Sequence, residues 1–130
     1  MRRWVAVAVL ASLLLPCLQP APPPTPPAPP ADSGATALTQ AHVVLAIHAA
    51  AVRWHVSEAR LDALARCESG LLPWARNPWS GTVGVFQFEP ATYWAYARAI
   101  HETKGPWDAW SAAQVAAYMV AIGQAGQWTC

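Results

Sequence analysis

Apolar residues recur at helical spacing over most of residues 38–126, and caps and breakers divide this pattern into four segments. Ser57 is a suitable N-cap for the second segment, and Gly70 is a suitable stop. Pro90 fits the first turn of the third segment, and Asp108 can cap the fourth. The pattern predicts helices over residues 38–54, from Ser57 to Gly70, over 90–103 and over 108–126.

Residues 71–90 break the helical pattern between the second and third predicted helices. They contain three prolines and two glycines, and the segment TVGVFQF (residues 82–88) is the only β-prone run nearby. We therefore expect an ordered loop with a short β-hairpin. The resulting fold class is a small, mainly α domain with this loop beside its functional groove.

The N-terminal third of the chain differs from the rest. Residues 1–19 combine two arginines with an apolar run that is short for a membrane span, which predicts a signal peptide or a retained N-terminal membrane anchor. Cys17 follows a sequence that resembles a bacterial lipoprotein box, except for proline at a position where a small residue is usual. Residues 20–37 then read as a stiff proline-rich linker, which leaves residues 38–130 as the folded domain.

Charge excludes one class of partner. From Asp32 onward the chain has six basic and seven acidic side chains, with no basic stripe, so we expect no nucleic-acid binding. Seven of the eight tryptophans lie in the domain, where core packing explains most of them. Trp74 and Trp79 lie in the loop instead, and either could stack on a sugar ring.

Cys67 and Cys130 are the only cysteines in the predicted domain. In an oxidising compartment two such thiols usually pair, and the bridge would tie the C-terminus to the residue before Glu68. A zinc site that used these thiolates and two of the four histidines is the alternative, although no close ligand spacing supports it.

Glu68 occupies the last turn of the second predicted helix, where the helix dipole disfavours a negative charge. Helix stability therefore does not account for this acid. Partial burial and the negative helix end should both raise its pKa, as a general acid near neutral pH requires. A carboxyl group of this kind suits cleavage of a glycosidic bond.

The stretch CESGLLPWARNPWSGTVGVFQFEPATYW resembles the core of lysozyme-like lytic transglycosylase domains, the superfamily of goose-type lysozyme and resuscitation-promoting factors. A Trp-x-Cys tail like residues 128–130 and an Ala-Ala-aromatic segment like residues 116–118 also occur in small exported members. The resemblance covers about residues 38–130 and rests on Glu68-Ser69-Gly70, Ala75, Asn77-Pro78, Ser80-Gly81, Gly84 to Phe88, Pro90, Thr92 and Trp94.

This resemblance implies that Glu68 is the catalytic acid and base, with no cofactor and no metal. Ser80 would orient the substrate or Glu68, and Gln87 would line the sugar groove. We add Trp74, Asn77 and Tyr118 as candidate substrate-binding residues. Tyr118 is the weakest of these, because the Ala-Tyr-Asn motif of larger members has no match in this sequence.

The implied activity is cleavage of the β-1,4 bond between N-acetylmuramic acid and N-acetylglucosamine in peptidoglycan, which leaves a 1,6-anhydro end. Hydrolysis on the same fold, a catalytically silent glycan-binding module and a helical interaction protein are the alternatives. We expect a monomeric, exported protein at the bacterial cell envelope, either periplasmic or extracellular, that is free or tethered to the membrane by its N-terminal segment or by lipidation.

Overall fold

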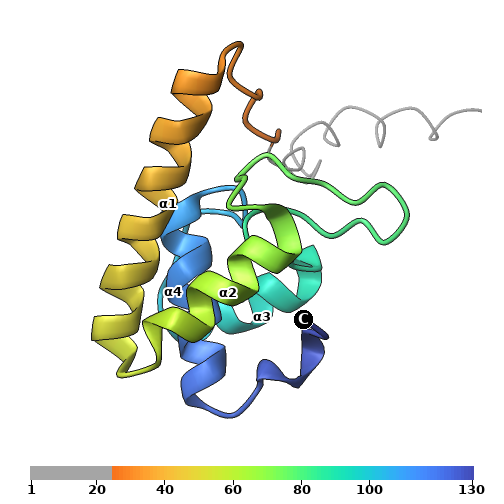
Figure 1. Ribbon diagram of the computed structural model, residues 1–130. Helices are drawn as coiled ribbons and strands as arrows, with labels where there is room; N and C mark the ends of the chain where they lie inside the picture. Colours follow the sequence, from red (N-terminus) through yellow and green to blue (C-terminus); the bar gives the residue numbers. More distant parts are fainter. Residues whose placement is uncertain (1–24) are drawn as a thin grey trace, which may run out of the picture.

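The computed structural model describes residues 25–130. The predicted signal or anchor segment and the first residues of the predicted linker lie outside the described residues. Residues 25–32 form no regular secondary structure, and helix α1 follows them directly (Figure 1).

Helix α1 spans Ser33–Trp54, so the predicted start at residue 38 was wrong. The side chain of Asp32 accepts a hydrogen bond from the backbone N–H of Ala35 at 2.7 Å. This N-cap satisfies one of the free donors at the helix start and lets the helix continue through Gly34.

Helices α2 and α4 begin where their caps predict. Helix α2 spans Glu58–Ser69, with the Ser57 side chain accepting from the N–H of Arg60 and with Gly70 in the left-handed conformation after the last turn. Helix α4 spans Ala109–Ala121, and Asp108 caps it in the same way. Its predicted extension to residue 126 was wrong, because the chain leaves the helix after Ala121 and forms the separate 3₁₀ turn η1, Ala125–Gln127.

Helix α3 spans Pro90–Ala99 and ends four residues before the predicted position. His101 has a positive φ of 62°, and the N–H of Glu102 bonds back to the carbonyl oxygen of Ala97 at 2.9 Å. This reversal is a C-terminal capping arrangement, and it turns Glu102 toward α4, where its carboxylate accepts from the Ser111 hydroxyl at 2.8 Å.

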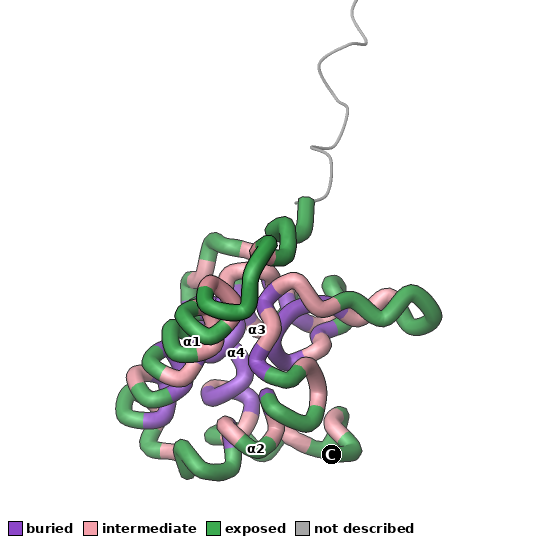
Figure 2. Tube along the Cα trace, turned by 45° about the horizontal axis from the view of Figure 1, so that its top comes forward, coloured by how far each residue is buried: buried purple, intermediate pink, exposed green. Residues whose placement is uncertain are grey.

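The other three helices pack around α4, as Figure 1 shows. Nearly every residue of α4 from Ala109 to Ala117 is buried, and in Figure 2 the buried colour is concentrated on α4 and on the inner faces of its neighbours. The mainly α fold class is confirmed. The core combines many buried alanines on α1 and α4 with larger side chains from these two helices and from the rest of the domain: Val43, Ile47, Leu61, Leu71, Val85, Phe86, Phe88, Tyr93, Val115 and Met119.

Among the described residues, α1 is the one helix long and apolar enough to cross a membrane by length and composition alone. Its Val43, Ile47 and Ala50 side chains are nevertheless fully buried in the core. One face of α1 therefore belongs to the core, whereas Leu38, Leu45 and Val52 of the same helix are exposed.

The loop between α2 and α3 contains two isolated antiparallel bridges in place of regular strands. Val83 pairs with Arg76 on one side and with Phe88 on the other. The expected β-hairpin is thus reduced to two tight turns: an outer turn, residues 76–82, and an inner turn, residues 83–88. The part of the loop before Val83 extends away from the helical body (Figure 1).

Candidate functional site

Glu68 lies in the last turn of α2 and is half-buried. Burial raises the pKa of its carboxyl group above the usual range for glutamate, because a charged carboxylate loses hydration there. The segment from Ser69 to Phe88 contains no other acidic residue. Glu68 is therefore the acid at this helix end, and the next acid along the chain is Glu89, the last residue of the loop.

Two contacts that the sequence did not reveal hold the end of α2 beside Glu68. The Ser69 hydroxyl lies 2.7 Å from the carbonyl oxygen of Val85 and accepts the N–H of Leu72 at 3.2 Å. The amide of Gln40 on α1 donates to the carbonyl oxygen of Gly70 at 2.9 Å. Ser69 and Gln40 are positioning residues, since they fix the backbone on which the acid is carried.

Gln87 connects the two turns of the loop. Its amide nitrogen donates to the carbonyl oxygens of Gly84 (2.9 Å) and Ala75 (3.2 Å), and its amide oxygen accepts from the Thr82 hydroxyl at 3.0 Å. Both amide hydrogens are used inside the loop. A direct contact between Gln87 and sugar stays a prediction, whereas its part in ordering the loop is visible.

Ser80 belongs to the same network. Its hydroxyl lies 2.8 Å from that of Thr82, so the hydrogen bonds run from Ser80 through Thr82 to Gln87. No hydrogen bond joins Ser80 to Glu68 in the described part of the chain. Its predicted role in orienting substrate or acid is therefore open, and its observed contacts stabilise the outer turn.

Asn77 shapes the tip of the loop. Its side-chain oxygen accepts from the N–H groups of Trp79 (2.9 Å) and Ser80 (3.3 Å), and its backbone oxygen accepts from Gly81 at 2.8 Å. This Asx turn fixes the loop without using the amide nitrogen of Asn77. Trp74, nearer to α2, is half-buried.

Tyr118 lies in a different environment from the loop residues. Its ring packs against Trp54 at a centroid distance of 4.9 Å and against Tyr96 at 6.4 Å. It thereby fills the junction of α1, α3 and α4, which is a packing role. Its predicted contact with substrate has no support in these contacts.

Cys67 and Cys130 form a disulfide, as predicted, and the two thiols are thus unavailable to a metal. The C-terminal tail runs from this bond back along the domain, and Trp128 donates its indole N–H to the carbonyl oxygen of Phe86 at 2.9 Å. Trp128 also packs edge-on against Phe88 at 5.6 Å. The tail therefore links the helix end that carries Glu68 to the inner turn of the loop.

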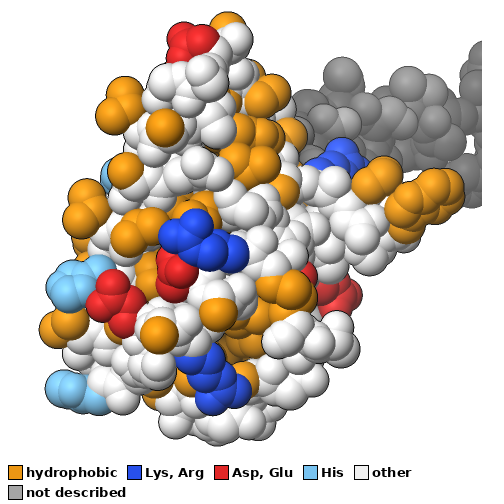
Figure 3. All heavy atoms as spheres, viewed as in Figure 1, with side chains coloured by type: hydrophobic (Ala, Val, Ile, Leu, Met, Phe, Trp, Pro, Cys, Tyr) orange, Lys and Arg blue, Asp and Glu red, His pale blue; other side chains and the backbone are white. Residues whose placement is uncertain are grey.

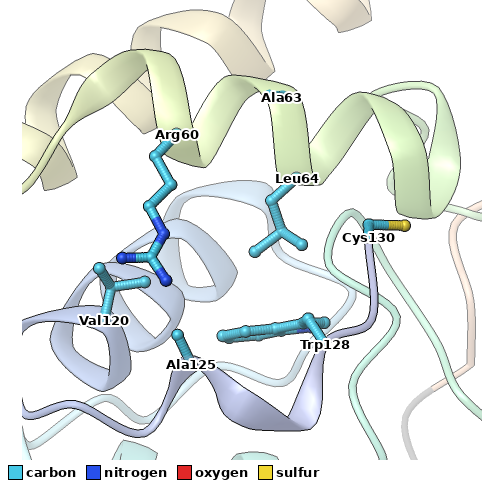
Figure 4. Close-up of a pocket in the computed structure, with 7 residues that line it drawn as sticks. All are labelled: Arg60, Ala63, Leu64, Val120, Ala125, Trp128 and Cys130. Carbon is cyan, nitrogen blue, oxygen red and sulfur yellow. The ribbon is translucent and has the colours of Figure 1, made fainter.

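Two small hollows, each of about 180 Å³, lie beside this tail. In the first, Figure 4 shows the flat indole of Trp128 below Leu64 and Arg60. The second lies between the inner turn and α3, next to Gln87 and Trp128. Glu68 lines neither of these two hollows.

The mainly helical fold is consistent with that of a small lysozyme-like domain. The family model described as transglycosylase SLT domain matches residues 46–125, and the chain belongs to this family. The match includes Glu68 and the whole loop, but it ends before Trp128 and Cys130. No curated protein and no solved structure matched the chain.

Proposed function

We propose that this protein is a peptidoglycan lytic transglycosylase with Glu68 as its general acid and base. Membership of the transglycosylase SLT domain family supports a glycosidase-type enzyme that acts on peptidoglycan. The observation that carries the proposal is the half-buried Glu68 carboxyl, whose pKa is raised by burial and which is the only acid from the end of α2 to Phe88.

The proposed reaction cleaves the β-1,4 bond from N-acetylmuramic acid to N-acetylglucosamine. Protonated Glu68 gives its proton to the bridging oxygen as the bond from that oxygen to the anomeric carbon breaks. The ionised carboxylate then takes the proton of the 6-hydroxyl of the same muramic acid residue. That oxygen bonds to the anomeric carbon, so the product has a 1,6-anhydro ring and Glu68 is protonated again.

A single carboxyl group is sufficient for this route, because the 6-hydroxyl group of the substrate is itself the nucleophile. Glu89 is the next acid along the chain, but it is exposed and its carboxylate accepts from the neighbouring Thr92 hydroxyl at 3.0 Å. We assign it no part in the chemistry. Hydrolysis by water on the same site would need no change to the fold.

Mass spectrometry of muropeptides released from purified peptidoglycan tests the proposal. A transglycosylase releases products with 1,6-anhydro ends, which are one water molecule lighter than the products of hydrolysis. Hydrated products would identify a muramidase, and an absence of released products would identify a glycan-binding module without activity.

We also propose export to the bacterial cell envelope, since peptidoglycan lies outside the cytoplasm. The disulfide between Cys67 and Cys130 supports this location, because such bonds persist in oxidising compartments. The choice between a cleaved signal, a retained anchor and a lipid on Cys17 belongs to residues outside the described part of the chain. Proteomic identification of the mature N-terminus would decide it.

A further inference from the structure

Trp79, at the tip of the loop between α2 and α3, is 94% exposed. Figure 3 shows hydrophobic side chains at the projecting end of this loop, well away from the main body of the domain. The other strongly exposed tryptophan among the described residues is Trp110, which is 44% exposed and lies on α4 beside His42. An indole held this far into solvent contributes almost nothing to the hydrophobic core.

The backbone under Trp79 is nevertheless well ordered by hydrogen bonds. Asn77 accepts the N–H of Trp79 at 2.9 Å, and the outer turn is joined through Ser80 and Thr82 to Gln87. The loop therefore presents the indole on a fixed support. A ligand that binds there loses little additional loop entropy.

We infer that Trp79 is a stacking platform for one pyranose ring of the glycan strand, at a distance from the bond that is cleaved. This inference rests on the proposed function and adds a substrate contact to it. β-Linked hexosamines carry their substituents equatorially, so each ring presents a flat face of C–H groups to an indole. The hydroxyl of Ser80 lies on the next residue and the amide of Asn77 two residues before Trp79, in the same turn, and they can meet the equatorial hydroxyl and acetamido groups.

The loop geometry places this contact outside the cleavage site. The N–H of Gly84 bonds to the carbonyl oxygen of Ala75 at 2.9 Å, which marks the base of the outer turn. From Ala75 to Trp79 the chain advances four residues, the last of them in a turn, so the extended-chain spacing gives an upper limit of roughly 13 Å. The base itself is tied to the end of α2 through Ser69 and Val85. Trp79 thus binds a sugar ring on one side of the cleaved bond. Glycan strands long enough to reach Trp79 therefore bind more tightly than short fragments.

The surroundings of Trp79 favour a sugar over a lipid surface. Peripheral binding to a membrane uses several apolar side chains together with a cluster of basic residues. The outer turn has one indole and one basic side chain, Arg76, and its remaining residues from 77 to 82 are polar, proline or glycine. A single flat apolar group surrounded by amide and hydroxyl groups matches the alternating surface of a sugar ring.

The test compares variants of the full chain in the Glu68→Gln background, so that the glycan is bound without being cut. The probe is purified peptidoglycan glycan strands freed of their peptides. We expect Trp79→Ala to raise Kd about fivefold to tenfold, which is the range for losing one favourable aromatic contact. Trp79→Phe should recover most of the affinity, and Trp110→Ala is the matched control that should bind like the parent.

Hydroxyl-radical footprinting of the Glu68→Gln protein gives a second measurement that does not depend on a substitution at Trp79. Bound glycan should protect Trp79 from oxidation severalfold and leave Trp110 unchanged. Equal oxidation of Trp79 with and without bound glycan, or equal affinity of the Trp79→Ala variant, would overturn the inference. If the parent Glu68→Gln protein binds no glycan at all, the proposed function itself fails, which is a distinct result.

Discussion

Replacing Glu68 with glutamine should separate catalysis from folding. Glutamine keeps the size and the polarity of the side chain and removes its proton, so turnover of peptidoglycan should fall at least about 100-fold, or about 2.7 kcal/mol in the activation barrier. Binding to glycan strands should survive, because the loop and the disulfide do not depend on the carboxyl group.

The same substitution has a defined effect on stability. Burial raises the pKa of Glu68 in the folded protein, so folding favours the protonated form. This favourable contribution is present below the unfolded pKa and is lost as the pH rises through the folded pKa. At neutral pH the carboxylate therefore opposes folding, and Glu68→Gln should melt at the same temperature as the parent or slightly above it. The difference should disappear at acidic pH.

Muropeptide release followed by mass spectrometry measures turnover, and thermal melts at several pH values measure stability. For the unmutated enzyme, activity should decrease as the pH rises through the raised pKa of Glu68, since the general acid must be protonated. Glu89→Gln is the control, because Glu89 is exposed and its side chain is bonded only to Thr92, so it should retain most activity. Full activity of Glu68→Gln would refute the assignment of the acid, and equal loss in both variants with hydrated products would indicate a two-carboxylate hydrolase.

Three further changes test the scaffold. Reduction of the bond between Cys67 and Cys130, which are 63 residues apart, should remove about 4 kcal/mol and lower Tm by roughly 15 °C or more; an unchanged melt after verified reduction would contradict this. Deletion of residues 1–31 keeps the Asp32 cap and should yield a soluble, active domain, whereas an unfolded product by circular dichroism would show that the removed residues are needed. Ser69→Ala leaves two backbone groups without their partner and should cost about 1–3 kcal/mol in denaturant unfolding; a cost near zero would show that water replaces the hydroxyl.

Local signals in the sequence were sufficient to predict most of the helices. Ser57, Gly70 and Asp108 act on residues three or four positions away, and these are the caps that fix α2 and the start of α4. The early start of α1 had such a signal in Asp32, but Gly34 and the preceding prolines favoured a loop over residues 33–37. The end of α3 depends on a backbone reversal at His101, which has a positive φ although it is not a glycine. The sequence therefore contains no local signal for this helix end.

The same distinction between local and long-range contacts applies to the candidate site. The place of Glu68 at the end of α2 and the disulfide between Cys67 and Cys130 were predicted, because the helix cap and the cysteine count are local features of the sequence. Gln40 and Trp128 could not be predicted, since they reach the site through contacts that span 30 and 42 residues. The packing of Tyr118 was not predictable for a related reason, because its partners Trp54 and Tyr96 come from two other helices, and its contact with substrate stays a prediction.

The residues next to Glu68 constrain the backbone at a position where the proposed function and folding stability make opposite demands. An acid that is half-buried at the negative end of a helix opposes folding at neutral pH, and in the proposed mechanism its removal to relieve that cost would also remove the reaction. The neighbouring positions provide the compensation: Cys67 is bonded to the C-terminus, Ser69 is hydrogen-bonded to the loop, and Gly70 takes the left-handed turn that ends the helix. Each constrains the backbone rather than the carboxyl group. The acid therefore keeps its exposure to substrate while the peptide on which it is carried is fixed on both sides.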